Sequence, residues 1–283
     1  MQTLTTVAEL RRVLADARRN NRRIGFVPTM GYLHDGHLAL VEASRGKCDV
    51  TVVSIFVNPT QFGPNEDLST YPRDFLRDEQ LCRDAGAAIV FVPGVEEIYP
   101  AQFDTFIEPG ELARPLCGAF RPGHFRGVAT VVSKLFNIVQ PDVAFFGQKD
   151  FQQCAVVRRM TVDLNLPIEI VAVATVREHD GLAMSSRNRY LRAEERRRAL
   201  AISRGLFEAE DQFRAGEREI GKLIAIAKKH LATVDRLQYI ELVDADTLKP
   251  AESPLRRTAA LCAAAYVGST RLIDNVILSL PAS

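Results

Sequence analysis

About the first 175 residues alternate between two kinds of segment, and this alternation limits the folds open to the chain. Short apolar runs rich in β-branched residues recur, and they read RIGFVP, DVTVVSIFV, AAIVFVP, DVAFFG and IEIVAVAT. Amphipathic stretches lie between several of them, namely HLALVEASRG, RDFLRDEQLCRDAG and FRGVATVVSKLFNIVQ. Apolar strands that alternate with helices indicate βαβ units and a parallel sheet. We therefore predict an α/β, Rossmann-like parallel-sheet domain, in which ligands bind beyond the carboxyl ends of the strands.

The pattern changes after about residue 178. Residues 192–216 and 218–232 are amphipathic and are predicted to form two helices, whereas residues 237–246 and 259–278 alternate as strands do. This order is typical of a small α+β domain. We therefore predict two domains, residues 1–177 and residues 178–283.

Composition and charge restrict the function classes. The chain is 47% hydrophobic and 25% charged, and 36 basic residues against 35 acidic residues give a net charge of +1. This balance gives no support to a role on nucleic acid or on a membrane surface. The basic run EERRRAL around Arg196 carries acidic neighbours and is interpreted as a solvated helix face.

Cysteine usage and the N-terminal stretch bear on location. The five cysteines form no C-x-x-C pair and their number is odd, which makes a disulfide framework or a zinc knuckle a poor interpretation. The first 20 residues are too charged for a signal peptide, and no apolar run approaches the length of about 20 residues that spans a bilayer. We expect a soluble cytoplasmic protein.

The stretch PTMGYLHDGH carries two of the five histidines directly after a predicted strand. Pro28 fits the end of a strand, and Gly31 and Gly36 permit tight turns. His34 and His37 share one face at the start of a predicted helix, where free N–H groups and the helix dipole suit a phosphate. A zinc site lacks an evident third ligand, and helix-start residues without a function are a further alternative.

Four other polar stretches also follow apolar runs or precede predicted helices. They are SIFVNPTQF with Gln61, RPGHFRGV with Arg121 and His124, FGQKDFQQ with Lys149, and MSSRN with Ser185, Ser186 and Arg187. Each is weak alone, but together at the rim of one sheet they indicate a site for a nucleoside triphosphate. No G-x-x-x-x-G-K-[ST] occurs, so the chain is not a P-loop enzyme.

These motifs together resemble the pantoate–β-alanine ligase family. The segments FVPTMGYLHDGH, SIFVNPTQF, RPGHFRGVATVVSKLFNIVQPD, FGQKDFQQ and MSSRNRYL occur in that family's order and spacing, from about residue 20 to residue 275. The family belongs to the superfamily of class I aminoacyl-tRNA synthetases and related nucleotidyltransferases. Their histidine motif corresponds to His34 and His37, and their mobile Lys-Met-Ser-Lys-Ser loop corresponds to MSSRN. Tyr32 stands where a smaller residue is expected, which alters the local shape without touching a catalytic role.

The resemblance implies a reaction in two steps. The carboxylate of (R)-pantoate attacks the α-phosphorus of ATP to give pantoyl adenylate and pyrophosphate, and β-alanine then displaces AMP to give pantothenate. Mg²⁺ is expected to accompany ATP, and the resemblance leaves open which protein groups contact the metal. It also implies an N-terminal domain that binds ATP and pantoate, a C-terminal lid domain and a homodimer.

The resemblance also implies roles for individual residues. The catalytic groups are His37, His34, Lys149, Ser185 and Arg187, and His37 is the residue suggested to supply a proton. The ATP-binding residues are Met30, Gly31, His34, Gly36, His37, Gly147, Gln148, Lys149, Asp150, Val176, Met184, Ser185, Ser186 and Arg187. Gln61 and Gln153 match the pantoate ligands, and Gln61 also matches the β-alanine contact. Arg121 and His124 either serve the site or anchor the turn before the next helix.

Two alternatives stay open at this point. One is another adenylyltransferase of the same superfamily, which would share the histidine pair. The other is a non-catalytic nucleotide-binding module. VNPTQF, FGQKDFQQ and the C-terminal domain favour the ligase over the first alternative. Both histidines, Lys149 and the run SSR argue against the second, because a simple binding module has no need of the full set of charge-neutralising groups.

Overall fold

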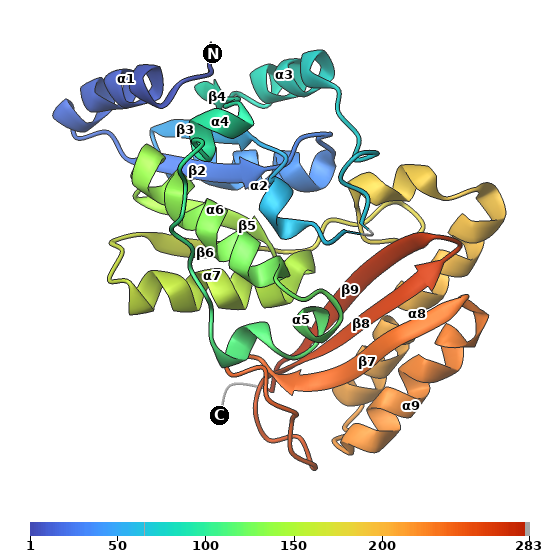
Figure 1. Ribbon diagram of the computed structural model, residues 1–283. Helices are drawn as coiled ribbons and strands as arrows, with labels where there is room; N and C mark the ends of the chain where they lie inside the picture. The colour runs from blue at the N-terminus through green and yellow to red at the C-terminus, as the bar shows by residue number, and fades with distance from the viewer. Residues whose placement is uncertain (65, 281–283) are drawn as a thin grey trace. The chain divides into compact units, whose positions relative to one another are not determined.

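A computed structural model describes residues 1–64 and 66–280 (Figure 1). The chain forms two compact units, which are described separately. Unit 1 comprises Met1–Ala113, Arg121–Gln148 and Gln153–Ala174, and unit 2 comprises Arg114–Phe120, Lys149–Gln152 and the chain from Thr175 onward. Unit 2 thus draws on three separate stretches of the chain, and the longest of them starts at Thr175. The division into domains of residues 1–177 and 178–283 stays a prediction.

Unit 1 is built around a parallel sheet. Its described residues form six strands in the order β1-β4-β3-β2-β5-β6, and every paired neighbour runs parallel. The strands are β1 (Gln2–Leu4), β2 (Ile24–Thr29), β3 (Val50–Ile55), β4 (Ile89–Phe91), β5 (Val143–Gly147) and β6 (Glu169–Val173). The α/β prediction is therefore confirmed, and all five apolar runs form strands. Strand β1 was not predicted, because at 3 residues it is too short to show a pattern.

Helices cover both faces of this sheet, as parallel sheets require. The regular helices of this part of the chain are α1 (Val7–Arg19), α2 (Asp35–Arg45), α3 (Phe75–Asp84), α4 (Val95–Ile98), α6 (His124–Val139) and α7 (Phe151–Asp163). Successive strand residues point to opposite faces. Phe26 on β2 meets Phe136 of α6 edge to face, with ring centroids 6.4 Å apart. The next residue, Val27, joins Leu40 and Val41 of α2 in a buried cluster.

The strand order creates a switch point beside β2. The chain passes from β2 outward to β3 and β4 and then returns to the other side of β2 as β5. Gly25 pairs with Val143 and Phe26 with Ala144, so β2 and β5 end at the same level of the sheet. In open α/β sheets, ligands bind outside the carboxyl ends of the strands at such a point. Met30 follows β2 there, and Gln148 follows β5.

Unit 2 packs helices on an antiparallel sheet. In its described residues the strands β7 (Arg236–Asp244), β8 (Ala259–Val267) and β9 (Thr270–Leu278) pair in that order. The long helix α8 (Ala193–Arg214) contacts β8 and β9, and α9 (Ile220–His230) contacts α8 and β7. Both predicted helices and the predicted strands are present. This unit also contains α5 (Cys117–Phe120), and a separate apolar core lies between its helices and its sheet.

Candidate active site

The histidine pair lies where β2 passes into α2. His34 is the N-cap residue of α2, and His37 is the third residue of that helix. The two ring centroids are 4.1 Å apart. The backbone N–H of His34 donates to Nδ1 of His37 over 3.2 Å. Because Nδ1 accepts this bond, the neutral ring carries its proton on Nε2, so that His37 offers an N–H donor at Nε2.

A buried carboxylate holds the turn that precedes the histidines. Gly31 and Tyr32 both have left-handed backbone conformations, with φ of 85° and 51°. Asp78 on α3 is 1% exposed and accepts the backbone N–H groups of Tyr32 (2.6 Å) and Leu33 (2.7 Å). Burial raises the pKa of Asp78, although these two hydrogen bonds act in the opposite direction. Asp78 therefore fixes a strained turn that leads directly into His34.

Arg77 completes this arrangement from the same helix. Its guanidinium donates to the carbonyl oxygen of Leu33 over 2.8 Å and lies 5.2 Å from the centre of the Tyr32 ring. Tyr32, which stands where the family resemblance predicts a smaller residue, has a left-handed backbone conformation, and its ring contacts this arginine. Sequence reasoning missed Arg77 and Asp78, because they belong to a helix whose amphipathic pattern alone does not show which turn it contacts.

Gln61 is oriented by a buried asparagine. Asn58 is 1% exposed, and its Nδ2 donates to Oε1 of Gln61 (3.0 Å) and to the carbonyl oxygen of Gly127 (3.1 Å). The other end of the amide, Nε2 of Gln61, points to the sulfur of Met30 over 3.0 Å. Gln61 and Met30, which the sequence assigned to different substrates, therefore lie together. The amide presents its nitrogen as the donor toward the end of β2.

Arg121 and His124 hold the backbone of Gln61. His124 Nδ1 lies 2.9 Å from the carbonyl oxygen of Gln61, which can only accept, so Nδ1 carries the proton. Arg121 NH1 lies 3.0 Å from His124 Nε2, and Arg121 donates twice to Glu66 at 2.6 Å. Burial alone would raise the pKa of Glu66, but the bonds from Arg121 outweigh it and the pKa is lowered. Both residues therefore tie the turn before α6 to the loop that carries Gln61 and Glu66, and a direct role in the site stays a prediction.

His124 also borders a small cavity in unit 1. The cavity has a volume of about 110 Å³, and Gln61, Phe106, His124 and Arg126 contribute to its lining. Arg126 lies over the Phe106 ring at 3.7 Å from its centre, and it also forms an ion pair with Glu108 at 3.3 Å. A small polar molecule beside Gln61 would therefore meet a cationic and aromatic wall. Anchoring and substrate contact are compatible at this position.

The neighbouring glutamines at the start of α7 differ in their surroundings. Gln152 is 6% exposed; it accepts the backbone N–H of Cys117 (2.9 Å) and donates to the carbonyl oxygen of Pro115 (2.7 Å). Both polar atoms of its amide are therefore occupied by the backbone near α5. Gln153, the predicted pantoate ligand, is only partly buried. Its binding role stays a prediction.

Lys149 lies in the short turn Gln148–Asp150 and is tied to β9. Its carbonyl oxygen accepts a hydrogen bond from Asn275 Nδ2 over 2.9 Å, and its ammonium lies 3.8 Å from Asp150. The preceding residue on β9, Asp274, is 4% exposed and forms a two-bond ion pair with Arg177 at 2.7 and 3.0 Å. Burial raises the pKa of Asp274, although Arg177 opposes the shift. Sequence reasoning could not foresee the contact with β9, since 126 residues separate Lys149 from Asn275.

The serine-rich segment continues a narrow hairpin of unit 2. The backbone N–H of Met184 donates to the carbonyl oxygen of Val176 over 3.0 Å, which places these two predicted ATP contacts side by side. Ser185 then caps the short 3₁₀ helix Ser186–Tyr190, because its hydroxyl accepts the backbone N–H of Arg187 over 3.3 Å. Ser186 is buried. One continuous segment therefore carries Val176, Met184 and the serines.

The predicted site residues form two groups when each unit is taken by itself. Unit 1 carries Met30, Gly31, His34, Gly36, His37, Gln61, Gly147, Gln148 and Gln153, and unit 2 carries Lys149, Asp150, Val176, Met184, Ser185, Ser186 and Arg187. Within residues 1–64 and 66–280, no group of three or more His, Cys, Asp or Glu side chains could hold a metal ion. The zinc alternative for His34 and His37 therefore gains no third ligand among those residues. All five cysteines are free thiols.

The fold and these polar groups together define a Rossmann-like α/β protein with an anion-suited helix start at its switch point, as in nucleotide-using enzymes. The family model described as Pantoate-beta-alanine ligase matches residues 2–277. The chain belongs to the pantoate–β-alanine ligase family and is an enzyme of the ligase class. The resemblance predicted from the sequence is confirmed.

Two similar proteins match this chain over 99% of its length. Pantothenate synthetase 1 of Bradyrhizobium diazoefficiens is 76% identical over 279 residues, which cover 99% of each chain. Pantothenate synthetase of Moorella thermoacetica is 55% identical over 282 residues, again with 99% of each covered. This family membership favours the ligase over the two alternatives that the sequence left open.

Solved structures show the same fold. Pantothenate synthetase from Thermus thermophilus superposes with a TM-score of 0.94 at 46% identity, covering 99% of this chain and 100% of that one. Pantoate-beta-alanine ligase from Francisella tularensis, complexed with beta-gamma ATP and beta-alanine, gives 0.81 at 34% identity, with 98% and 97% covered. Across the described residues, no helix has both the length and the apolar character needed to cross a bilayer.

Proposed function

We propose that the enzyme joins (R)-pantoate to β-alanine through a pantoyl adenylate. In the first step a carboxylate oxygen of pantoate attacks the α-phosphorus of ATP, and the bond to pyrophosphate breaks. In the second step the β-alanine amine attacks the acyl carbon, AMP leaves with the bonding electron pair, and the amine loses a proton. The products are pantothenate, AMP and pyrophosphate, which places the enzyme in the synthesis of pantothenate and coenzyme A.

The observation that carries this proposal is the histidine turn at the switch point of the parallel sheet. Carboxylate attack on a phosphate brings negative charges together, so the site must present donors that are already oriented. His37 offers Nε2–H because Nδ1 accepts a backbone hydrogen bond. We assign His34 and His37 as donors to the phosphates, and Lys149, Ser185, Ser186 and Arg187 as further phosphate-binding groups.

Neutral amides suit the acid substrate. Gln61 presents a donor nitrogen whose orientation Asn58 sets. An amide can orient a carboxylate without the strong ion pair that would lower its nucleophilicity. We assign Gln61 and Gln153 to pantoate, and Gln61 also to β-alanine. The Francisella tularensis ligase is described as a complex with beta-gamma ATP and beta-alanine, which supports the binding of ATP and β-alanine by the present chain.

Mg²⁺ is assigned to the ATP substrate rather than to a resident site. The described residues contain no cluster of three or more candidate ligands, so phosphate oxygens and water would supply most of its coordination. The metal would neutralise phosphate charge when bound. We also propose a homodimer and a lid role for the C-terminal domain, both from the resemblance, and a cytoplasmic location, from the cysteine usage and the charged N-terminal stretch.

Two assays test this function directly. ATP–pyrophosphate exchange should require pantoate, and steady release of AMP should require both pantoate and β-alanine. Exchange that proceeds without pantoate but with a phosphopantetheine or mononucleotide acceptor would favour the alternative adenylyltransferase. ATP binding measured by titration calorimetry with no turnover of any acid would favour the binding module.

Variants then test the assigned residues. Lys149→Ala and His37→Ala should each reduce exchange by about 10²-fold or more while the protein stays folded, because each removes an oriented donor. Gln153→Ala should raise the KM for pantoate and leave the KM for ATP nearly unchanged. Normal exchange in the first two variants would contradict their roles, and equal effects on both KM values would remove Gln153 from the acid pocket.

A further inference from the structure

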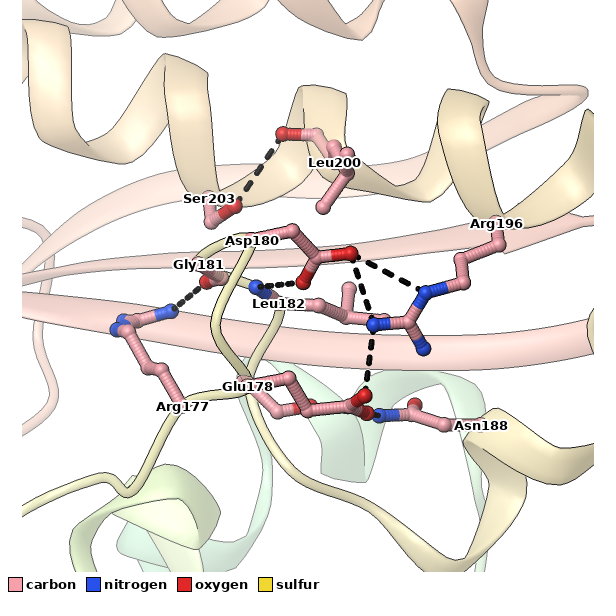
Figure 2. A network of polar contacts seen from close by, with 10 residues as sticks. Arg177, Glu178, Asp180, Gly181, Leu182, Asn188, Arg196, Leu200 and Ser203 are labelled. Atoms are coloured by element: carbon pink, nitrogen blue, oxygen red, sulfur yellow. Dashed lines mark hydrogen bonds and ion pairs between the residues drawn. The ribbon is translucent and has the colours of Figure 1, made fainter. Parts of the chain in front are cut away.

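A network of charged side chains in unit 2 surrounds the hairpin that leads to the serine-rich segment (Figure 2). The hairpin runs from Val176 to Met184, and Glu178 and Asp180 lie at its tip. Two carboxylates this close in sequence repel each other at a turn. A cation that contacts both of them would therefore decide whether the turn keeps its shape.

Arg196 on α8 is that cation. Its NH2 donates to Glu178 over 2.6 Å, and its Nε and NH2 donate to one oxygen of Asp180 over 3.1 and 2.8 Å. Figure 2 shows the guanidinium between the two carboxylates. The side chains of Arg196, Glu178 and Asp180 are 28%, 24% and 20% exposed, so the pairs are partly desolvated and stronger than surface pairs. The hydrogen bond to Glu178 raises the pKa of Arg196.

Glu178, which Arg196 holds through one carboxylate oxygen, also contacts the serine-rich segment. Its second oxygen accepts a hydrogen bond from Asn188 Nδ2 over 2.7 Å, and the same nitrogen donates to the carbonyl oxygen of Ala183 over 3.0 Å. Asn188 follows Arg187 directly. Glu178 and Ala183 thus hold Asn188 on one side of Ser185–Arg187, and the backbone bond between Val176 and Met184 holds the other side.

The neighbouring arginine provides a contrast within the same run of sequence. Arg197 is 73% exposed and pairs with Glu194, which is 64% exposed, within the first turns of α8. Such exposed pairs contribute little to stability. The sequence interpretation of EERRRAL as a solvated helix face therefore holds for Arg197 but is wrong for Arg196, whose guanidinium faces the hairpin.

We propose that Arg196 is a positioning residue for the adenylation step: through Glu178 and Asp180 it fixes the hairpin and hence the place of Ser185 and Arg187. Its anchor is the 22-residue helix α8, whose inner face is buried in the core of unit 2. The inference rests on the proposed role of Ser185 and Arg187 in binding phosphates. It adds that a segment corresponding to a mobile loop in related enzymes is held here by an ion-pair network.

The test compares Arg196→Gln with Arg197→Gln. Glutamine removes the charge in both cases, but only the first variant leaves Glu178 and Asp180 partly buried and unpaired. Pantoate-dependent ATP–pyrophosphate exchange should fall about 10- to 100-fold in kcat/KM for ATP with Arg196→Gln, since small displacements of catalytic groups have effects of this size. The KM for pantoate should stay within about twofold, and Arg197→Gln should match the parent within about twofold on every measurement.

Backbone hydrogen exchange gives a readout that does not depend on activity. The amides of Glu178, Met184 and Asn188 donate within the hairpin and the following turn. In Arg196→Gln they should exchange at least about tenfold faster, while the amides of β8 keep the parent rate because local opening is confined to the affected segment. Unchanged exchange at these amides, or equal loss of ATP and pantoate kinetics, would overturn the inference.

Two further variants guard against a global folding defect. Arg196→Lys keeps the charge but cannot bridge both carboxylates as a fork, and it should fall between the parent and Arg196→Gln. Asn188→Ser removes the link to Glu178 without changing any charge, and it should reproduce the faster exchange of Met184.

Ser185→Ala separates the proposed phosphate-binding role of the segment from the proposed positioning role of Arg196. If Ser185→Ala leaves catalysis normal, the phosphate-binding role fails, whereas the hydrogen-exchange result still decides whether Arg196 holds the segment.

Discussion

At the scale of single residues, the ring of His37 has two distinct tasks. Nδ1 accepts the backbone N–H of His34, which fixes the ring, and Nε2 is then left as the donor. A second proton on this ring would break the hydrogen bond and would place a positive charge at the positive end of α2. This geometry favours a role for His37 as a neutral hydrogen-bond donor over a role as a proton donor.

Two amide substitutions separate these roles. His37→Gln retains an N–H donor at about the position of Nε2, whereas the shorter amide of His37→Asn reaches only about the position of Nδ1 and leaves no donor at the position of Nε2. If His37 acts as a neutral donor, His37→Gln should keep about tenfold more ATP–pyrophosphate exchange than His37→Asn. Exchange rates over a range of pH, with Tm as the folding control, provide the measurement. Equal loss in both variants, together with loss of one limb of the pH profile, would instead support proton donation.

The sequence contained little information about the residues that hold the site residues in place. It identified His34, Gln61 and Lys149 because motifs mark them. It did not show the supporting roles of Asp78, which holds the turn before His34, and of Asn58, which orients the amide of Gln61. Such supporting residues carry no periodic signal of their own, and only the packing of separate elements shows which turn they contact.

At the scale of elements, α6 and the short 3₁₀ turn Pro59–Gln61 approach closely because of one glycine. A Cβ atom added at Gly127 would lie 2.4 Å from the carbonyl oxygen of Thr60 and 2.7 Å from the Cα atom of Gln61. These are backbone atoms, so a side-chain rotation cannot relieve the contact. The position of Gln61 therefore depends on the absence of a side chain at residue 127.

Gly127→Ala should displace the turn and weaken binding of pantoate more than binding of ATP. We expect a rise of about tenfold or more in the KM for pantoate and a loss of about 1–3 kcal/mol of stability, as for overpacked sites. Gly221→Ala on α9 is the matched control, because nothing lies within 4 Å of its added Cβ. Alanine there should leave the kinetics unchanged and raise Tm slightly. Parent-like pantoate kinetics in Gly127→Ala would contradict the proposed dependence.

The alternation of segments predicted these elements well, and it did so for a physical reason. Strands buried on both faces must be continuously apolar, and helices that cover them must be amphipathic, so both leave periodic traces in the sequence. Strand order leaves no such trace. The placement of β5 beside β2, which creates the switch point, depends on long-range pairing and became visible only in the structure.

At the scale of the whole molecule, each of the two units has its own buried core, and the residues proposed for ATP are divided between them. A ligand that binds only the folded protein stabilises it by mass action. At a concentration of about 100 times Kd, ATP should add about 2.7 kcal/mol and raise Tm by about 5 °C for a chain of this size.

Variants in each unit test the stabilisation by ATP without any measurement of catalysis. His37→Ala in unit 1 and Lys149→Ala in unit 2 should each reduce the rise in Tm caused by ATP, because each removes a proposed phosphate contact. Gln153→Ala should keep the full rise with ATP, since Gln153 is assigned to pantoate. Differential scanning calorimetry over a range of ATP concentrations provides the measurement, with each variant's own Tm as its reference. A full ATP-induced rise in Lys149→Ala would show that the lysine does not bind the nucleotide in the ground state, and its role would then be confined to the transition state of adenylation.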